Sequence, residues 1–249
     1  LLRTDLVSSW RQATPAHAPN RFVINIMPDQ AQAFRSHLEQ AGVQGYDWFP
    51  MIRGRLVEVN GQAVHPENYT DDRAQRMLDR EFNLSNALAM PDKNTVTAGQ
   101  WVAGEADGAS VEDGIAQTLG LHLGDTLVFD IGGVRHSARL TSLRKVDWGS
   151  MRANFFIMFP VASVPDVPTT YMAAYRAPAQ AGFDNALLRQ FPNITNVDLD
   201  STIAQVQRVL DQVIRAVEFL FAFTLAAGLV VLFAAVTATR EERAREYAI

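Results

Sequence analysis

The side chains that most often carry out chemistry in proteins are thinly spread along this sequence. Ser150, in the stretch WGSM, lacks the second glycine of a hydrolase nucleophile elbow. The five histidines show no H-E-x-x-H or other metal-ligand spacing. They are His17, His37, His65, His122 and His136. We therefore predict no catalytic residue and no metal site in this chain.

Nucleotide binding and acid–base catalysis lack their usual patterns as well. Neither a G-x-x-x-x-G-K-[ST] phosphate loop nor a G-x-G-x-x-G fingerprint occurs, so we expect no cofactor in this chain. Asp71 and Asp72 are adjacent on a predicted helix, where neighbouring side chains point to different faces. The absence of cysteine excludes thiolate chemistry and disulfides. The sequence thus predicts a protein that is not itself an enzyme.

One cluster of charged and aromatic side chains lies within residues 144–152. It comprises Arg144, Lys145, Asp147, Trp148 and Arg152. One interpretation is a docking site for a lipid headgroup or a partner. The other is the end of a strand, where the charges pair locally and the tryptophan packs inward. The sequence leaves both open and favours the second.

The composition indicates a folded protein that does not bind nucleic acid. The 249 residues are 48% hydrophobic and 20% charged, and 14 Phe and 4 Trp supply ample apolar surface, which excludes a disordered chain. The net charge is −5, and the 22 basic residues are dispersed, so no concentrated basic face for phosphate contacts is expected.

The mean hydropathy of −0.04 conceals one segment suited to a membrane. Residues 219–238 read FLFAFTLAAGLVVLFAAVTA and carry no charge. As a helix they span about 30 Å, the thickness of a bilayer's hydrocarbon core. The alternative is a buried core helix, but such helices keep a polar stripe and this segment has none. We therefore predict a transmembrane helix over residues 219–238.

The residues before this span extend the same helix. Residues 201–218 carry apolar side chains at helical spacing, and no Gly or Pro separates them from the span. We predict a stalk helix over residues 201–218 that continues into the membrane as a rigid lever. Within the span, small side chains four residues apart allow close approach of other helices. These pairs are Ala222 with Ala226 and Thr224 with Gly228.

Both ends of the sequence predict a piece of a longer polypeptide. The chain does not begin with Met, and Ile249 ends it within a charged helical pattern. Residues 1–20 are predicted to be a membrane-exit and lead-in segment, with an ordinary surface helix as the alternative for its first half. The arginines after the span slightly favour a cytoplasmic location for residues 239–249, and therefore an external domain.

The domain before the stalk combines two strand–helix–strand units with a long insertion. The first unit has strands at 21–28 and 47–59 around a helix at 30–41, and the second has strands at 169–177 and 194–199 around a helix at 183–190. Together they predict one α/β layer, formed by residues 21–60 and 169–200.

The insertion, residues 61–168, is predicted to be a β-rich subdomain with two helices. The helices are expected at 71–84 and at 110–119, the second capped by Ser110. Strands at 126–131 and 134–146 flank Gly132-Gly133, which is a two-residue hairpin signal. A buried strand is expected at 154–159.

Several stretches of the sequence carry a family resemblance. Within the domain they are PNRFVINIMPDQ, FPMIRGRLVEVNG, SVEDGIAQTLGLHLGDTLVFDIGG and TSLRKVDWGSMRANFFIMFP. These resemble the extracytoplasmic domain of FtsX-like (MacB-type) ABC transporter permeases, in the YbbP-like branch. The final stretch, FTLAAGLVVLFAAVTATREERAREYAI, resembles the start of the permease core of that family. The L-G-D-T and T-R-E-E-R-x-R-E patches are the most specific parts.

This resemblance implies an α+β fold and a transport function. The α/β layer would be a porter-like subdomain split by the β-rich insertion and followed by the long helix. A separate ABC-type ATP-binding subunit would hold ATP on the cytoplasmic side, and its movements would reach the external domain through the long helix. Residues Arg240, Glu242, Arg243 and Arg245 would lead toward contact with that subunit.

The resemblance also implies a location and a substrate class. The full-length protein would be a multi-pass protein of the bacterial inner membrane, with residues 1–218 mostly periplasmic and the C-terminus cytoplasmic. Substrates would be lipids or other hydrophobic molecules, and a periplasmic thioesterase or lysophospholipase would be a possible partner. The alternative is a membrane-anchored sensor with an external ligand-binding domain. A tethered hydrolase is disfavoured because no nucleophile–base pair is found.

Overall fold

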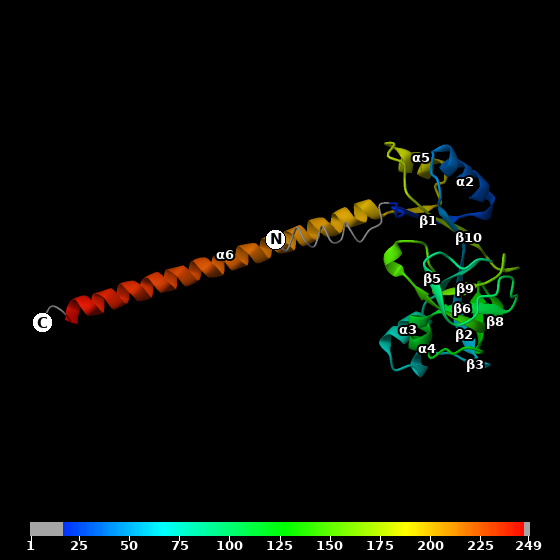
Figure 1. Cartoon of the computed structure of the whole chain (residues 1–249), viewed down its shortest axis with the longest axis horizontal. Coiled ribbons are helices and arrows are strands. Elements are labelled where there is room, and N and C mark those ends of the chain that lie inside the picture. Colours follow the sequence, from blue (N-terminus) through cyan, green and yellow to red (C-terminus); the bar gives the residue numbers. More distant parts are fainter. Residues whose placement is uncertain (1–16, 247–249) are drawn as a thin grey trace. The chain divides into compact units, whose positions relative to one another are not determined.

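The structure, a computed structural model, describes residues 17–246. It divides into two units, of which the first ends at Asp198 and the second begins at Leu199. The first unit is a mixed α/β domain, and the second is one long helix, α6 (Leu199–Glu246) (Figure 1). The predicted mixture of helices and strands and the long apolar C-terminal helix are both confirmed. Most of the predicted lead-in, residues 1–20, lies outside the described residues.

The α/β layer is an antiparallel four-stranded sheet in the order β11-β1-β10-β2. Helices α2 and α5 pack against one face of this sheet (Figure 1). The core between them is apolar: Val23 and Ala173 of the sheet pack with Phe34 of α2 and Leu187 of α5. The elements are β1 (Arg21–Ile26), α2 (Ala31–Gln40), β2 (Asp47–Val59), β10 (Thr170–Tyr175), α5 (Phe183–Gln190) and β11 (Thr195–Asp198).

Strand β2 belongs to both halves of the domain. Residues 47–51 pair with β10 in the α/β layer, whereas residues 52–59 pair with β4, β7 and β3. The strand crosses from one half to the other near Ile52. The structure thus divides the two halves inside β2, while the sequence places the division after residue 60.

The inserted segment folds into a small closed barrel. Its ladders form a circuit in the order β2-β4-β9-β6-β8-β7 and back to β2, with β3 and β5 added outside. The interior is apolar and fully buried, as at Leu84, Val111 and Phe129. The elements are β3 (Gln62–Ala63), α3 (Asp72–Leu78), β4 (Phe82–Asn86), β5 (Asn94–Gly99), β6 (Gly108–Glu112), α4 (Asp113–Leu119), β7 (Thr126–Ile131), β8 (Val134–Val146) and β9 (Ile157–Phe159), with 3₁₀ turns η1 (Pro28–Gln30), η2 (Pro66–Asn68) and η3 (Trp148–Ser150).

Three predictions within the insertion need correction. The helix predicted over 71–84 ends at Leu78, because β4 takes the following residues into the barrel wall. Ser110 does not cap a helix: it is buried in β6, and the carboxylate of Glu112 caps α4 by accepting a hydrogen bond from the Ile115 amide at 2.9 Å. The strand predicted over 154–159 is formed only at Ile157–Phe159.

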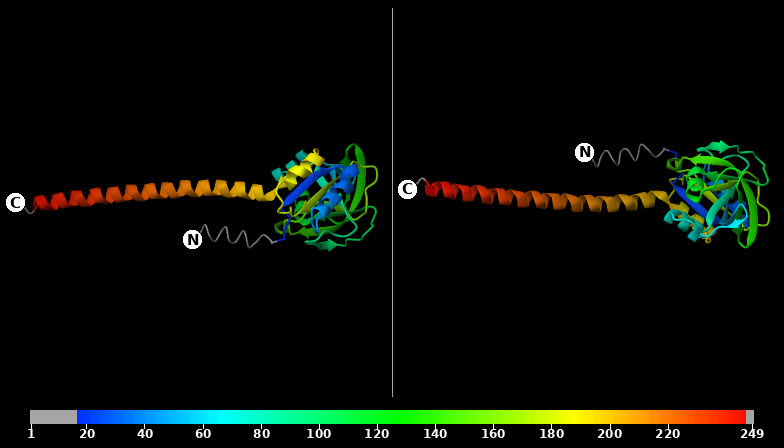
Figure 2. Two further views of the ribbon diagram at one scale, coloured as in Figure 1. Left: turned by 90° about the horizontal axis from the view of Figure 1, so that it is seen from above. Right: turned by 90° about the horizontal axis from the view of Figure 1, so that it is seen from below.

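Helix α6 is unbroken over 48 residues, which corresponds to about 72 Å. Figure 2 shows it as one continuous rod in two further views. Residues Leu199–Arg240 contain an 18-residue window with a mean hydropathy of 2.6, so this helix is long and apolar enough to cross a membrane. The predicted stalk and span therefore lie in one helix.

Candidate functional site

Arg144, the first member of the predicted docking cluster, is inside the domain. Its side chain is fully buried, and its guanidinium donates to Ser110 Oγ at 2.8 Å and to Asn94 Oδ1 at 2.5 Å. It also donates to the carbonyl oxygens of Phe155 at 2.9 Å and Phe156 at 3.2 Å. A partner at the surface cannot reach this group, so the docking interpretation is wrong for Arg144.

The position of Arg144 follows from the alternation of β8. Side chains at Ala138, Leu140, Ser142 and Val146 share its face and are buried. Burial lowers the pKa of Arg144 to about 10, against the opposing influence of nearby acidic side chains, so the group stays charged at neutral pH. A charged group bound to neutral acceptors joins β5, β6, β8 and the segment before β9.

Three other members of the cluster are exposed at the end of β8. They are Lys145, Asp147 and Trp148. The Asp147 carboxylate accepts a hydrogen bond from the Gly149 amide at 3.1 Å and so stabilises the 3₁₀ turn η3. Trp148 is 47% exposed, and its ring lies 5.0 Å from that of Phe156. Trp148 therefore packs along the surface rather than inward.

Arg152 clamps the α/β layer to the segment that leads into β9. Its Nε donates to Asp47 Oδ2 at 2.8 Å, and the Asp47 carboxylate also accepts from the amide of Ala153 at 3.2 Å. The hydrogen bond to Asp47 is the main cause of a raised pKa for Arg152. Asp92 lies 3.4 Å from the same guanidinium. This local pairing supports the strand-end interpretation for Arg152.

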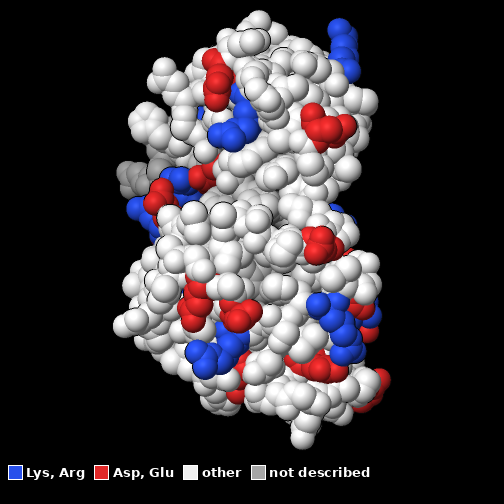
Figure 3. Space-filling model, turned by 90° about the vertical axis from the view of Figure 1, so that its right-hand side faces the viewer, with Lys and Arg blue, Asp and Glu red and all other residues white. Residues whose placement is uncertain are grey.

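Figure 3 shows one face of the domain, with acidic and basic side chains scattered among uncharged ones. No extended patch of one sign covers this face. A docking site held by strong electrostatic attraction would need such a patch. The face in Figure 3 therefore offers no such site.

The described part of the chain contains no candidate metal site. No group of three or more His, Cys, Asp or Glu side chains among residues 17–246 could hold a metal ion. His136 packs against Phe159 with ring centroids 4.8 Å apart, and its pKa is lowered chiefly by burial, with Asp107 opposing the shift. His37 contacts the rings of Phe183 and Phe191 in the layer core. Both histidines have packing roles.

The apolar part of α6 satisfies its own polar groups. Three threonine hydroxyls donate to the carbonyl oxygen four residues earlier, at 2.8 Å for Thr224, 3.0 Å for Thr237 and 2.8 Å for Thr239. In hydrocarbon an unbonded hydroxyl costs several kcal/mol, so these bonds make the helix compatible with a bilayer.

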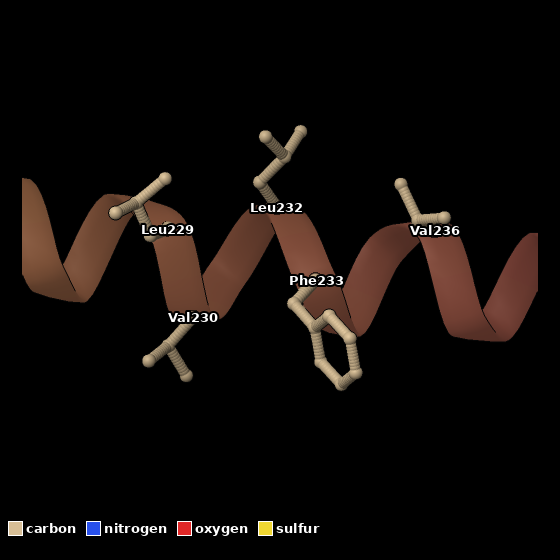
Figure 4. A pocket seen from close by; sticks show the side chains of 5 residues that line it. All are labelled: Leu229, Val230, Leu232, Phe233 and Val236. Carbon is tan, nitrogen blue, oxygen red and sulfur yellow. The ribbon is translucent and has the colours of Figure 1, made fainter.

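Apolar side chains cover more than one side of this helix. Figure 4 shows them projecting outward in different directions. The residues shown are Leu229, Val230, Leu232, Phe233 and Val236, which line a shallow hollow on the helix surface. This hollow belongs to a single helix and is not an enclosed ligand site.

The predicted coupling residues lie on the last turns of α6. Arg240 and Arg243 are exposed. Glu242 and Arg245 also belong to α6, but their side chains lie outside the described part of the structure. Contact of these residues with a second subunit stays a prediction.

Comparison with known proteins identifies a relative over the whole chain. No protein-family model matches the sequence. The sequence is 35% identical over all 249 residues to YbbP of Escherichia coli K12, which is described as an uncharacterized ABC transporter permease. This chain is homologous to part of an ABC transporter permease. The resemblance to the YbbP-like branch is thereby confirmed.

The homologous region is a limited part of the YbbP permease. The chain covers 30% of the length of that protein. Two solved structures are also similar to the chain, both with TM-scores below 0.5. The periplasmic region of MacB from Actinobacillus actinomycetemcomitans has a TM-score of 0.42 and 10% identity, over 77% of this chain and 94% of that one. A domain assigned to a permease of Porphyromonas gingivalis has a TM-score of 0.34 and 11% identity, over 73% and 83%.

Proposed function

We propose that this chain is the external domain and following membrane helix of an ABC transporter permease subunit. The observation that carries the proposal is the single helix that begins at the domain's last strand and continues through an apolar segment, in a chain homologous to a permease. In this proposal the domain is periplasmic and porter-like, residues 219–238 cross the bacterial inner membrane, and the C-terminus is cytoplasmic.

The chain itself would be non-enzymatic and would bind no cofactor. A separate ATP-binding subunit would hydrolyse ATP in the cytoplasm and contact the charged end of α6, where Arg240 and Arg243 are exposed. Movement of α6 would reach the external domain and drive the movement or extraction of lipids or other hydrophobic molecules. A periplasmic thioesterase or lysophospholipase is a further candidate partner.

Purification of the full-length protein from membranes tests the proposal. We expect an ATP-binding subunit to co-purify and the complex to hydrolyse ATP. A protein that purifies alone, shows no ATPase activity and binds a soluble ligand through its external domain would contradict the permease and favour a membrane-anchored sensor.

The lever role of α6 has a separate test. Two glycines inserted after Gln212 introduce flexible residues into a helix that has no Gly between its start and Gly228. Two alanines inserted at the same place shift the helix register equally but keep the helix stiff. We expect the glycine insertion to abolish ATP-dependent changes in the external domain more completely than the alanine insertion, with ATP hydrolysis retained. Equal responses in the two variants would contradict a rigid lever.

A further inference from the structure

The attachment of the strand that precedes α6 is unusually dependent on polar contacts. Strand β11 has four residues and, among the residues that the structure describes, pairs only with β1 at an edge of the sheet. None of its side chains is fully buried, and Val197 is 41% exposed. A short edge strand with so little apolar burial opens easily. Something besides the backbone ladder must hold it.

A cluster around Arg21 supplies these contacts. Arg21 lies on β1 with its side chain 11% exposed, and its Nη1 donates to Asp198 Oδ1 at 2.8 Å. Its Nε and Nη2 donate to the two carboxylate oxygens of Asp184, each at 3.0 Å. Asp198 is the last residue of β11, and Asp184 lies in the first turn of α5. One guanidinium therefore joins the end of β11 to both β1 and α5.

A second bond within this cluster ties β11 to α5 directly. Asn196 of β11 donates through Nδ2 to Asp184 Oδ1 at 2.8 Å. Burial acts to raise the pKa of Asp184, but the hydrogen bonds from Arg21 and Asn196 outweigh it and the pKa is lowered. The carboxylate is thus ionised at neutral pH and is a strong acceptor for both donors.

We propose that Arg21 is a positioning residue that fixes the start of α6 to the α/β layer. Because Leu199 follows Asp198 directly, any pull on α6 first acts on the end of β11. With Arg21 in place, that pull is shared with β1 and α5. Without it, β11 opens more readily from the sheet edge, although its ladder with β1 and the Asn196–Asp184 bond remain, and the movement no longer reaches α5. The coupling part of this inference rests on the proposed permease function, whereas the attachment of β11 does not.

Hydrogen–deuterium exchange of the full-length protein in lipid nanodiscs tests the attachment. We expect Arg21→Met to speed exchange of the β11 amides by about tenfold, because loss of a partly buried ion pair makes local opening of the strand more frequent. Arg135→Met is the matched control, because it removes an Arg–carboxylate pair with Glu58 in the barrel, where Nη1 and Oε1 are 2.6 Å apart. Unchanged β11 exchange in Arg21→Met would overturn the proposal. Protection of β7 amides checks that both variants are folded.

The coupling role is tested in the complex with the ATP-binding subunit. We expect a non-hydrolysable ATP analogue to change exchange in α5 in the wild type and in Arg135→Met, but not in Arg21→Met, while the ATPase rate is kept. Arg21→Lys should restore part of the response, because an ammonium reaches one carboxylate but not both. A full α5 response in Arg21→Met would overturn the coupling role.

Loss of the permease function and loss of the β11 attachment would give different results. A wild-type protein with no ATP-binding partner and no nucleotide response would overturn the proposed function, and the coupling role with it. The exchange of β11 without nucleotide would still decide whether Arg21 holds that strand.

Discussion

Replacing Arg144 with methionine tests whether the buried guanidinium holds the barrel wall together. Methionine fills much of the same volume with a flexible apolar chain but donates no hydrogen bond. The substitution removes four hydrogen bonds of 3.2 Å or less, to Ser110, Asn94, Phe155 and Phe156. Two of these acceptors keep another partner: Ser110 Oγ is bonded to Ser142, and the Phe156 carbonyl accepts from the Glu112 amide.

The expected loss of stability is the difference between two opposing effects. Each hydrogen bond to a charged group makes a net contribution of about 1.5 kcal/mol to stability, so four of them stabilise the fold by about 6 kcal/mol. Burial lowers the pKa of Arg144 to about 10, which corresponds to a cost of about 3 kcal/mol for keeping the charge inside the domain. Methionine removes both effects. We therefore expect Arg144→Met to lower the free energy of unfolding by about 3 kcal/mol.

Urea denaturation of the detergent-solubilised chain, followed by tryptophan fluorescence, measures this difference. Arg139→Met is the matched control, because Arg139 is exposed on the same strand. We expect the control to change the free energy of unfolding by less than about 0.5 kcal/mol. If Arg144→Met were as stable as the wild type, the hydrogen bonds would contribute no more than the cost of burying the charge, and Arg144 would not stabilise the barrel wall.

Three further predictions concern Gly99, Asp184 and Arg152. Gly99→Ala makes Cβ clash with the carbonyl oxygen of Thr141 on β8 at a φ of +71°, so thermal denaturation should show that the free energy of unfolding falls by more than about 3 kcal/mol. The control Gly42→Ala, at a φ of +80° with open space around Cβ, should lower it by only about 1 kcal/mol. Asp184→Asn should make the exchange of the β11 amides less sensitive to acid. Because the pKa of Asp184 is lowered in the folded protein, the stabilisation by its carboxylate is present above the ordinary carboxyl pKa and is lost as the pH falls through the folded pKa. The same dependence of β11 exchange on pH in the wild type and in Asp184→Asn would contradict this. Arg152→Met should lower stability by about 2 kcal/mol in urea denaturation, since the Asp47 carboxylate is left partly buried; no loss would show that the Asp47 clamp is dispensable.

Local patterns predicted the elements that local forces determine. The β7–β8 hairpin matches its predicted strands, because Gly132 and Gly133 adopt the positive φ values, +59° and +86°, that a tight two-residue turn requires. Helix α5 begins and ends as its apolar spacing predicts. The long helix follows from the lack of Gly or Pro before Gly228.

The features that the sequence did not predict depend on contacts between residues far apart in the chain. Residues after Leu78 carry helix-compatible charges, yet Phe82 and Leu84 alternate and are drawn into the barrel wall by pairing with β2. One of the two interpretations of the Arg144 cluster was a surface docking site, although Arg144 falls on the same alternation as Leu140 and Val146, which are buried. The Arg21 cluster had no such signal, because Asp184 and Asp198 lie 163 and 177 residues away in sequence.

Strand β2 joins the two halves of the domain mechanically, because it belongs to both. Two subdomains joined only by a loop could move independently of each other. Here the backbone of β2 is hydrogen-bonded to β10 through residues 47–51 and to the barrel through residues 52–59. An apolar cluster that includes Met51, Phe155 and Met172 packs across the same junction, beside the Arg152–Asp47 clamp. Displacement of the α/β layer must therefore carry the barrel with it, and in the coupling path that we propose from α6 the weak point is the four-residue strand β11.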